Sequence, residues 1–219
     1  MTPNEFKAET GVDDTALARL QIYADLLVKW QAKINLVGPD TLPDLWSRHL
    51  FDSAQLAPYI EQGAKVADLG SGAGFPGMVL AIMRDDLDVH VVESDQRKCA
   101  FLREVNRETG AGATVHNARI EALEPLRADV VTSRALASLD KLLAFAHIHR
   151  LSTGKCLFPK GKRWAEELTD AQKTWRMPAI KLPNWNQLAA THPWAQENDI
   201  LYKNPHKSTD VSTCMITAN

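Results

Sequence analysis

The chain lacks the features that mark secreted, membrane-spanning and metal-binding proteins. Its 219 residues include three cysteines, Cys99, Cys156 and Cys214, and this odd, scattered set favours neither a disulfide framework nor a metal site. No apolar run approaches the roughly 18 to 20 residues that span a bilayer. The residues from Met1 to Lys7 lack the basic and then apolar pattern of a signal peptide. We therefore expect a soluble, cytoplasmic protein without a metal site.

Acidic residues are missing from one long stretch. The whole chain carries a net charge of −2, which does not mark it as a nucleic-acid binder. Between Lys141 and Ala165, however, there is no Asp or Glu, and the cations there are Lys141, Arg150, Lys155, Lys160, Lys162 and Arg163. We interpret this acid-free stretch as a candidate for phosphate contacts, with an ordinary solvated face as the alternative.

The pattern of apolar residues divides the chain into a helical N-terminal region and an α/β domain. Apolar residues recur at helical spacing from Asp13 to Trp30 and again from Leu42 to Tyr59, which predicts a helical region over residues 1–62 packed on the core. Over residues 63–219, apolar strands alternate with helical segments, as in a parallel sheet with helices on both faces. We expect strands near 64–69, 88–93, 112–116, 128–132 and 153–158, and helices near 76–84, 95–109, 138–149 and 163–174.

A glycine-rich turn between the first of these strands and the next helix is the most informative motif. The segment from Val66 to Gly77 has the sequence VADLGSGAGFPG, with glycines at every second position of the turn. Glycine has no Cβ, so it reaches positive φ and lets the backbone approach a ligand closely. We therefore expect a nucleotide-like cofactor to lie against Gly70, Gly72 and Gly74.

Two classes of cofactor fit this turn. Residues 72–77 match the dinucleotide pattern G-x-G-x-x-G, and Glu93 follows at the spacing of a ribose-binding acid. However, Pro76 at the predicted first helical position removes an N–H group that a pyrophosphate would bind. The charge of Asp68, just before the turn, would also repel a phosphate. S-adenosylmethionine has a sulfonium, an ammonium and a ribose diol but no phosphate, so it is the cofactor that we predict.

The last part of the chain departs from the alternation of strands and helices. Strands are expected at residues 180–182, 199–203 and 212–217, with the turn from Asn204 to Lys207 between the last two. An antiparallel hairpin that closes a mostly parallel sheet is typical of class I S-adenosylmethionine-dependent methyltransferases, so we predict that Rossmann-like fold. The pattern assigns no structure to residues 183–198.

Polar residues follow the carboxyl ends of the predicted strands, where ligands bind in open α/β sheets. A carboxylate such as that of Glu93 can accept from both ribose hydroxyls, and we expect Asp68 to act on the amino-acid end of the cofactor, directly or through water. The turn Ile120-Glu121 is expected at the adenine, with an exposed helix start as the alternative. Arg134 is suited to the cofactor carboxylate or to an RNA phosphate, or else to a structural salt bridge.

Five segments, taken in order, resemble the ribosomal RNA small subunit methyltransferase G family, also called GidB. They are Asn35-Leu36-Val37, Arg48 to Ser53 (RHLFDS), Asp68 to Gly77, Ser133 to Ser138 (SRALAS) and Pro159-Lys160-Gly161. The glycine motif alone is generic to methyltransferases. The pattern R-H-x-x-D-S before it and S-R-A-x-A-S after it make the combination specific, whereas the residues after Trp164 match poorly.

The resemblance implies methyl transfer from S-adenosylmethionine to N7 of a guanine in the 530 loop of 16S rRNA, with the rRNA or the small ribosomal subunit as partner. It implies that residues 63–219 form the methyltransferase domain. It also implies cofactor contacts at Gly70, Phe75, Ile120, Glu121 and Arg134. The resemblance favours a role in the site for Arg48 and, less strongly, for His49. Without the resemblance, a histidine on an amphipathic helix is more often a packing residue. Nothing in the sequence suggests an obligate partner, so we expect a monomer.

Absent motifs constrain the chemistry. The Asn/Asp-Pro-Pro-Tyr/Phe turn of many exocyclic-amine methyltransferases is replaced by Ser133-Arg134-Ala135, and no cysteine has an activating motif. Guanine N7 carries a lone pair and needs no general base, so transfer depends on positioning and on stabilising the cationic purine. Arg48 and Lys160 are candidates for recognising guanine near O6, and we add His49, Lys162 and Arg163 as candidate RNA contacts.

Three other functions stay open. The first, a methyltransferase for a small molecule or a protein, is disfavoured by the basic stretch and the family motifs. The second, a dinucleotide-dependent oxidoreductase, is disfavoured by Pro76, by Asp68 and by the lack of an evident proton-transfer dyad. The third is a cofactor-sensing module that binds ribosomes without chemistry, which a test for methyl incorporation would separate from an enzyme.

Overall fold

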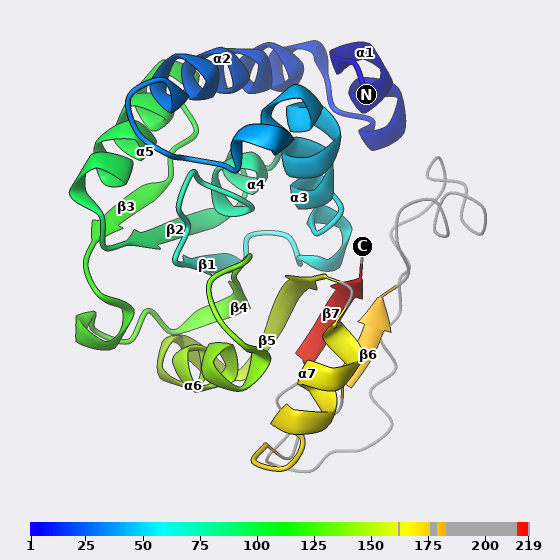
Figure 1. Ribbon diagram of the computed structural model, residues 1–219, viewed down its shortest axis with the longest axis vertical. Coiled ribbons are helices and arrows are strands. Elements are labelled where there is room, and N and C mark those ends of the chain that lie inside the picture. The colour runs from blue at the N-terminus through cyan, green and yellow to red at the C-terminus, as the bar shows by residue number, and fades with distance from the viewer. Residues whose placement is uncertain (162, 176–178, 183–213, 219) are drawn as a thin grey trace.

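A seven-stranded sheet forms the centre of the protein in the computed structural model, which describes residues 1–161, 163–175, 179–182 and 214–218. The strand order is β3-β2-β1-β4-β5-β7-β6, and the described pairs are parallel (Figure 1). The strands are β1 (Lys65–Leu69), β2 (Asp88–Glu93), β3 (Thr114–Asn117), β4 (Ala128–Thr132), β5 (Arg150–Lys160), β6 (Ala179–Leu182) and β7 (Cys214–Ala218). The strand order reverses between β1 and β4, which is the switch point where open α/β sheets bind ligands.

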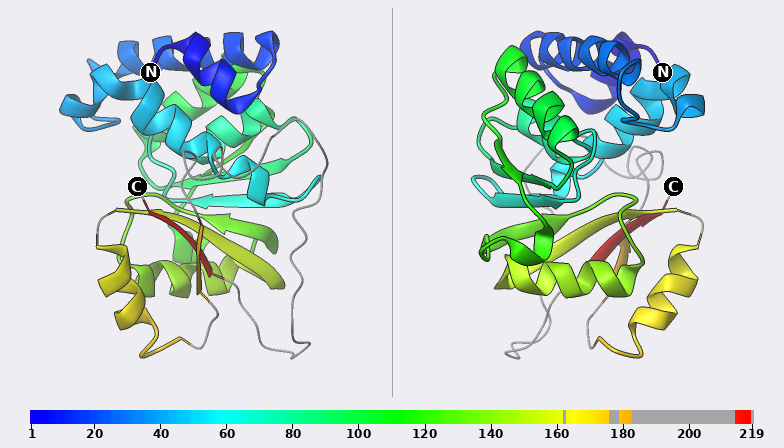
Figure 2. Two further views of the ribbon diagram at one scale, coloured as in Figure 1. Left: turned by 90° about the vertical axis from the view of Figure 1, so that its right-hand side faces the viewer. Right: turned by 60° about the vertical axis from the view of Figure 1, so that its left-hand side comes forward.

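Successive residues of the central strands bury their side chains in two separate layers. Val66 and Val130 pack with the N-terminal helices, α4 and α5, whereas their neighbours Ala67 and Val131 pack with α6 and α7. Figures 1 and 2 show these two groups of helices on opposite sides of the sheet. The helices are α1 (Pro3–Thr10), α2 (Asp14–Gln31), α3 (Asp52–Ala54), α4 (Gly77–Met83), α5 (Gln96–Thr109), α6 (Leu139–His149) and α7 (Trp164–Ala171). The α/β fold expected from the sequence is thereby confirmed. Within the described ranges, no helix has the length and apolarity needed to cross a membrane.

The helical stretch expected from Leu42 to Tyr59 is broken into short turns. It contains a 3₁₀ turn η1 (Pro39–Asp44), a π turn η2 (Trp46–Phe51), α3 and a second 3₁₀ turn η3 (Ala57–Tyr59). Prolines at positions 43 and 58 lack the N–H group that a regular helix needs, so one long α-helix cannot form here. The π turn carries the R-H pair of the R-H-x-x-D-S motif, and turns of this kind are frequent at functional sites.

The antiparallel hairpin expected near the C-terminus is wrong. Strand β6 (Ala179–Leu182) forms where a strand was expected, but β7 pairs parallel with β5 on one side and with β6 on the other. Both edges of β7 are therefore occupied, and no edge is left for an antiparallel partner. The other expected strand of the hairpin, residues 199–203, and the unassigned segment 183–198 lie outside the described residues.

Helix α4 lies so close to the sheet that its first residue has to be glycine. The helix begins at Gly77, one residue later than expected, with Pro76 directly before it. A Cβ atom added to Gly77 would lie 2.7 Å from Cγ1 of Val91 and 2.8 Å from Cβ of Asp68. The glycine motif is thus required for packing as well as for the backbone conformation of the turn.

We expect the Gly77→Ala variant to lose about 1–3 kcal/mol of unfolding free energy, because the added methyl group overpacks the contact between α4 and the sheet. Gly161→Ala is the matched control, since a Cβ atom there would meet no atom of the described residues within 4 Å. Urea unfolding measures both variants. Equal stability of the two would contradict the close approach of α4 to the sheet.

Candidate active site

A cleft of about 1340 Å³ opens where the carboxyl ends of β1, β2, β4 and β5 meet. The upstream π turn contributes Arg48 and His49 to one wall of this cleft. A smaller hollow of about 150 Å³, lined by Ile120 and Glu121, shares Gly70 and other residues with the cleft. An extended ligand can therefore lie across both.

The three glycines of the turn all have positive φ, but they face different surroundings. The φ angles are 67° at Gly70, 60° at Gly72 and 96° at Gly74. A Cβ atom on Gly72 would meet only the Gly70 carbonyl oxygen, at 3.9 Å, whereas one on Gly74 would lie 2.6 Å from Cγ of Met78. Gly70 and Gly72 line the cleft, but Gly74 packs against α4 and α2. Of the three glycines predicted to contact the cofactor, Gly74 is thus the one that the structure places in packing contacts and not among the residues lining the cleft.

Five backbone N–H groups of the turn and of the start of α4 donate hydrogen bonds inside the protein. The donors are the N–H groups of Ser71, Gly72, Gly74, Phe75 and Gly77. Gly72 donates to the Glu93 carboxylate at 2.9 Å, and Gly77 donates to Asp68 at 3.0 Å. A pyrophosphate needs such N–H groups free at the start of the helix. The turn therefore suits a ligand that does not depend on them.

Asp68 lies beneath the turn rather than in the cleft. Its side chain is fully buried, and Oδ2 accepts hydrogen bonds from the Ser71 hydroxyl and from the Gly77 N–H group. Burial raises the pKa of Asp68 to about 6, although the two hydrogen bonds and the Arg134 charge lower it. Within the described part of the chain, Oδ1 of Asp68 has no hydrogen-bond partner. Asp68 is not among the residues that line the cleft, and within the protein its carboxylate holds the turn.

Glu93 lies at the border between the cleft and the smaller hollow. Its Oε2 accepts from the Gly72 N–H group at 2.9 Å and its Oε1 from the Asp95 N–H group at 2.8 Å. Each carboxylate oxygen can accept a further hydrogen bond. The two backbone donors fix the orientation of Glu93 and leave capacity for the hydroxyls of a ribose.

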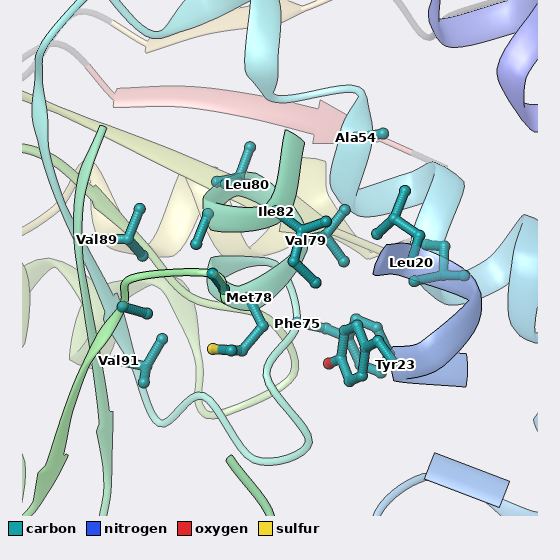
Figure 3. Close-up of a cluster of buried hydrophobic side chains, with 14 of the residues drawn as sticks. Leu20, Tyr23, Ala54, Phe75, Met78, Val79, Leu80, Ile82, Val89 and Val91 are labelled. Atoms are coloured by element: carbon teal, nitrogen blue, oxygen red, sulfur yellow. The ribbon is translucent and has the colours of Figure 1, made fainter. Parts of the chain in front are cut away.

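Arg134 joins the loop after β4 to the upstream π turn. Its Nη1 donates to the Arg48 carbonyl oxygen at 3.0 Å, and its Nη2 lies 2.7 Å from Nδ1 of His49. The guanidinium also lies over the Phe75 ring, 4.8 Å from its centroid. Tyr23 and His49 both stack on Phe75, with ring centroids 5.4 and 5.1 Å away, and Figure 3 shows Tyr23 beside Phe75. Arg134 forms no ion pair with a described acid, and its contacts with the π turn brace the wall of the cleft.

The hydrogen bonds of His49 determine which of its ring nitrogens carries the proton. Because an arginine can only donate, Nδ1 of His49 is the acceptor, and Nε2–H donates to the Thr41 hydroxyl at 2.8 Å. Burial, followed by the charges of Arg134 and Arg48, lowers the pKa of His49 to about 4. His49 is therefore neutral at physiological pH and holds Arg134 in place without competing for anions.

The turn η4 (Ile120–Ala122), which was predicted to contact the adenine, lies beside the smaller hollow. Ile120 is buried and Glu121 is exposed. The Ile120 carbonyl oxygen accepts from Nε2 of the buried His149 at 2.8 Å. Helix α6 thereby fixes the turn from below.

The acid-free stretch does not form one basic surface. It runs through α6 and along the whole of β5, so its cations lie at opposite ends of the sheet. Lys155 pairs with Glu61 at 2.7 Å, and Lys160 pairs with Glu167 at 2.6 Å while also donating to the Ala137 carbonyl oxygen. Of its cations, Lys160 and the exposed Arg163 line the cleft, and Lys162 lies outside the described residues.

Three residues with a role at the cleft were missed by sequence reasoning. The Tyr23 hydroxyl donates to the Ala73 carbonyl oxygen and so supports the glycine turn. Its position on the apolar face of α2, beside Leu20, gave the signal, since a buried tyrosine needs a hydrogen-bond partner. Asp52 lines the cleft four residues after Arg48, and Leu136 covers Gly70. Both belong to segments that carry the resemblance to the family, RHLFDS for Asp52 and SRALAS for Leu136.

The site agrees with a comparison against known families. The family model of GidB, rRNA small subunit methyltransferase G, matches residues 16–194. The chain belongs to this family. It is similar to the ribosomal RNA small subunit methyltransferase G of Paramagnetospirillum magneticum, with 59% identity over 84% of this chain and 90% of that protein. For the protein of that name in Rhodospirillum centenum, identity is 51% over 82% of this chain and 83% of that one.

Among solved structures, the chain is similar to a TehB-like SAM-dependent methyltransferase from Corynebacterium glutamicum. The TM-score is 0.47 and the sequence identity is 17%, over 71% of this chain and 82% of that chain.

We expect the Asp68→Asn variant to gain stability relative to the wild type as the pH rises. The folded-state pKa near 6 lies above the usual 3.8, so the folded protein holds this proton more tightly than the unfolded chain does. The wild type therefore loses stability as the pH rises from the lower to the higher pKa. Between acidic and neutral pH, the difference in unfolding free energy should shift by about 3 kcal/mol in favour of Asp68→Asn. Urea unfolding over that pH range measures it, and a difference independent of pH would contradict the burial of this carboxyl group.

His49 should titrate far below an ordinary histidine. An NMR titration of its Cε1 proton should give a midpoint near 4, because burial and two arginine charges disfavour the imidazolium ion. In the Arg134→Ala variant the midpoint should rise, since one of those charges is removed. A wild-type midpoint near 6.5 would show that the ring is neither buried nor held by Arg134.

Proposed function

We propose that this chain transfers the methyl group of S-adenosylmethionine to N7 of a guanine in the 530 loop of 16S rRNA. As a member of its family, the chain is a methyltransferase for the rRNA of the small subunit. The observation that carries the cofactor assignment is the hydrogen bonding of the glycine turn, whose N–H groups donate to Asp68 and Glu93. Negative charge with few free donors suits a sulfonium and an ammonium better than a diphosphate.

The residues around the turn fit the parts of this cofactor. We assign Glu93 to the ribose diol, the turn Ile120-Glu121 to the adenine, and Gly70, Gly72, Phe75 and Arg134 to the methionine end. Asp68 supports the site through its charge and its hold on the turn. When bound, S-adenosylmethionine supplies a methyl group on a positively charged sulfur. The task of the chain is to hold that group and to orient the acceptor.

The chemistry of the cleft supports an acceptor that needs no activation. Cys99 and Cys156 are buried away from the cleft, and burial raises the pKa of Cys156 to about 12, so neither is a nucleophile. Guanine N7 is unprotonated at neutral pH and needs no general base. We assign RNA contacts to Arg48, His49, Lys160, Lys162 and Arg163. Arg48 and Arg163 are the exposed cations that line the described cleft.

We further propose that the chain works as a monomer in the cytoplasm. The helical region 1–62 acts as a part of the methyltransferase unit, because one cluster of buried side chains contains Leu20 and Tyr23 together with Val66 and Val91. Removal of this region would leave the turn without Tyr23 and the cleft without its upstream wall.

Transfer of a labelled methyl group tests the proposed function. Small subunits or naked 16S rRNA from cells without this modification should take up label from S-adenosylmethionine at one guanine. Borohydride and aniline should then cleave the rRNA at that guanine, since this chemistry reports N7 methylation. Calorimetry should detect binding of S-adenosylhomocysteine and none of NAD.

Each other outcome favours a different function. Binding of NAD without S-adenosylhomocysteine would indicate an oxidoreductase. Tight binding of S-adenosylhomocysteine without methyl incorporation into either RNA would indicate a cofactor-sensing module. Label in the guanine without chain cleavage would contradict the assignment to N7.

A further inference from the structure

Asp52 presents an available carboxylate to the cleft. It begins α3, directly after the π turn, and its side chain is half-buried in the cleft wall. Its Oδ1 lies 3.4 Å from Nε2 of Gln55, which is a long contact. Within the described part of the chain, Oδ2 meets no hydrogen-bond donor.

The other carboxylates of the cleft each accept at least one short hydrogen bond within the protein. Glu93 accepts from two backbone N–H groups, and Glu167 accepts from the side chain of Lys160 and from the N–H group of Leu139. The remaining two are Asp140, which accepts from Trp175, and Asp170, which accepts from Lys173. Among the described acids that line the cleft, Asp52 is thus the one that accepts no short hydrogen bond within the described part of the chain.

Two arginines lie near Asp52, yet it forms an ion pair with neither of them in the described structure. Burial raises the pKa of Asp52 to about 6, and the charges of Arg134 and Arg48 oppose that rise, so both arginines are within electrostatic reach. Arg134 is directed to the Arg48 carbonyl oxygen and to His49 instead. Arg48 is exposed and lies four residues before Asp52. A cation and a carboxylate on one wall of the cleft are therefore both available to a ligand that has donors as well as acceptors.

Guanine has the donors that a carboxylate requires. Its Watson–Crick edge offers N1–H and the N2 amino group side by side, and no other RNA base offers two neighbouring donors on that edge. When N7 faces the cofactor, this edge points away from the glycine turn. As N7 gains the methyl group, the ring becomes positively charged and N1–H becomes a stronger donor. A carboxylate at that edge therefore binds the transition state more tightly than the substrate.

We infer that Asp52 selects the acceptor base by accepting hydrogen bonds from N1–H and N2–H of guanine. This assignment rests on the proposed function of the chain and adds the residue that determines its specificity. It uses a carboxylate that neither the fold nor the cofactor contacts employ.

The first test compares two acid-to-amide variants on small subunits. Asp52→Asn keeps the size of the side chain but replaces one acceptor with a donor that opposes the guanine amino group. We expect its kcat/KM for methyl transfer to fall by about 10- to 100-fold. Binding of S-adenosylhomocysteine, measured by calorimetry, should stay unchanged. The matched control is Asp44→Asn, because Asp44 is exposed on the 3₁₀ turn η1 and does not line the cleft; its activity should equal that of the wild type.

The second test changes the base. A 16S rRNA ligated with inosine at the acceptor position keeps N7 and N1–H but lacks the N2 amino group. For the wild type, kcat/KM should be about 10-fold lower on this RNA than on the guanosine RNA. For Asp52→Asn, kcat/KM should be nearly the same on the two RNAs. Non-additivity of this kind indicates that the two changes remove one interaction.

The outcomes separate this inference from the proposed function. If the wild type does not methylate the guanosine RNA, the proposed function itself fails. If the wild type is active, any one of three results overturns the inference alone. The first is a kcat/KM of Asp52→Asn equal to that of Asp44→Asn. The second is an equal fall in kcat/KM for Asp52→Asn and the wild type on the inosine RNA, and the third is loss of S-adenosylhomocysteine binding by Asp52→Asn.

Discussion

The buried carboxylate of Asp68 holds together the strand, turn and helix on which the site is built. It belongs to β1, accepts from the hydroxyl of Ser71 in the turn, and accepts from the N–H group of Gly77 at the start of α4. Burial opposes its charge, and these donors offset only part of that penalty. The same corner has no space for a side chain at residue 77. A side chain at residue 77 is therefore excluded, and the path of the turn is held by contacts within the protein.

Two of the cations around the cleft are held by partners within the protein. Lys160 is paired with Glu167, and Arg134 is held by the Arg48 carbonyl oxygen and by a neutral His49. A surface organised in this way attracts RNA only through the few cations that stay exposed, in keeping with the slightly negative charge of the whole chain. Recognition of the acceptor then depends on positioned hydrogen bonds more than on a strong positive field.

Local patterns in the sequence predicted the parts of the structure that local physics determines. The apolar strands, the helices between them and the glycine turn follow from periodicity and from the backbone freedom of glycine. The position of β7 does not, because pairing over a long separation depends on which edge is free and not on local preference. The partners of Arg134 and Lys160 were also hidden: the contact of Arg134 with His49 joins residues 85 positions apart. A lysine at a strand end cannot be identified as paired until α7 is placed over it.

The contacts of Phe75 have a consequence for the nascent chain during translation. Tyr23 and His49, which stack on this ring, leave the ribosome before the turn that contains it. Until β1 and α4 emerge, the nascent helices expose Leu20 and Tyr23, whose partners in the buried cluster have not been synthesised. Translation that stops before residue 66 would thus release a fragment with an uncovered apolar face, which is a target for aggregation or for chaperones.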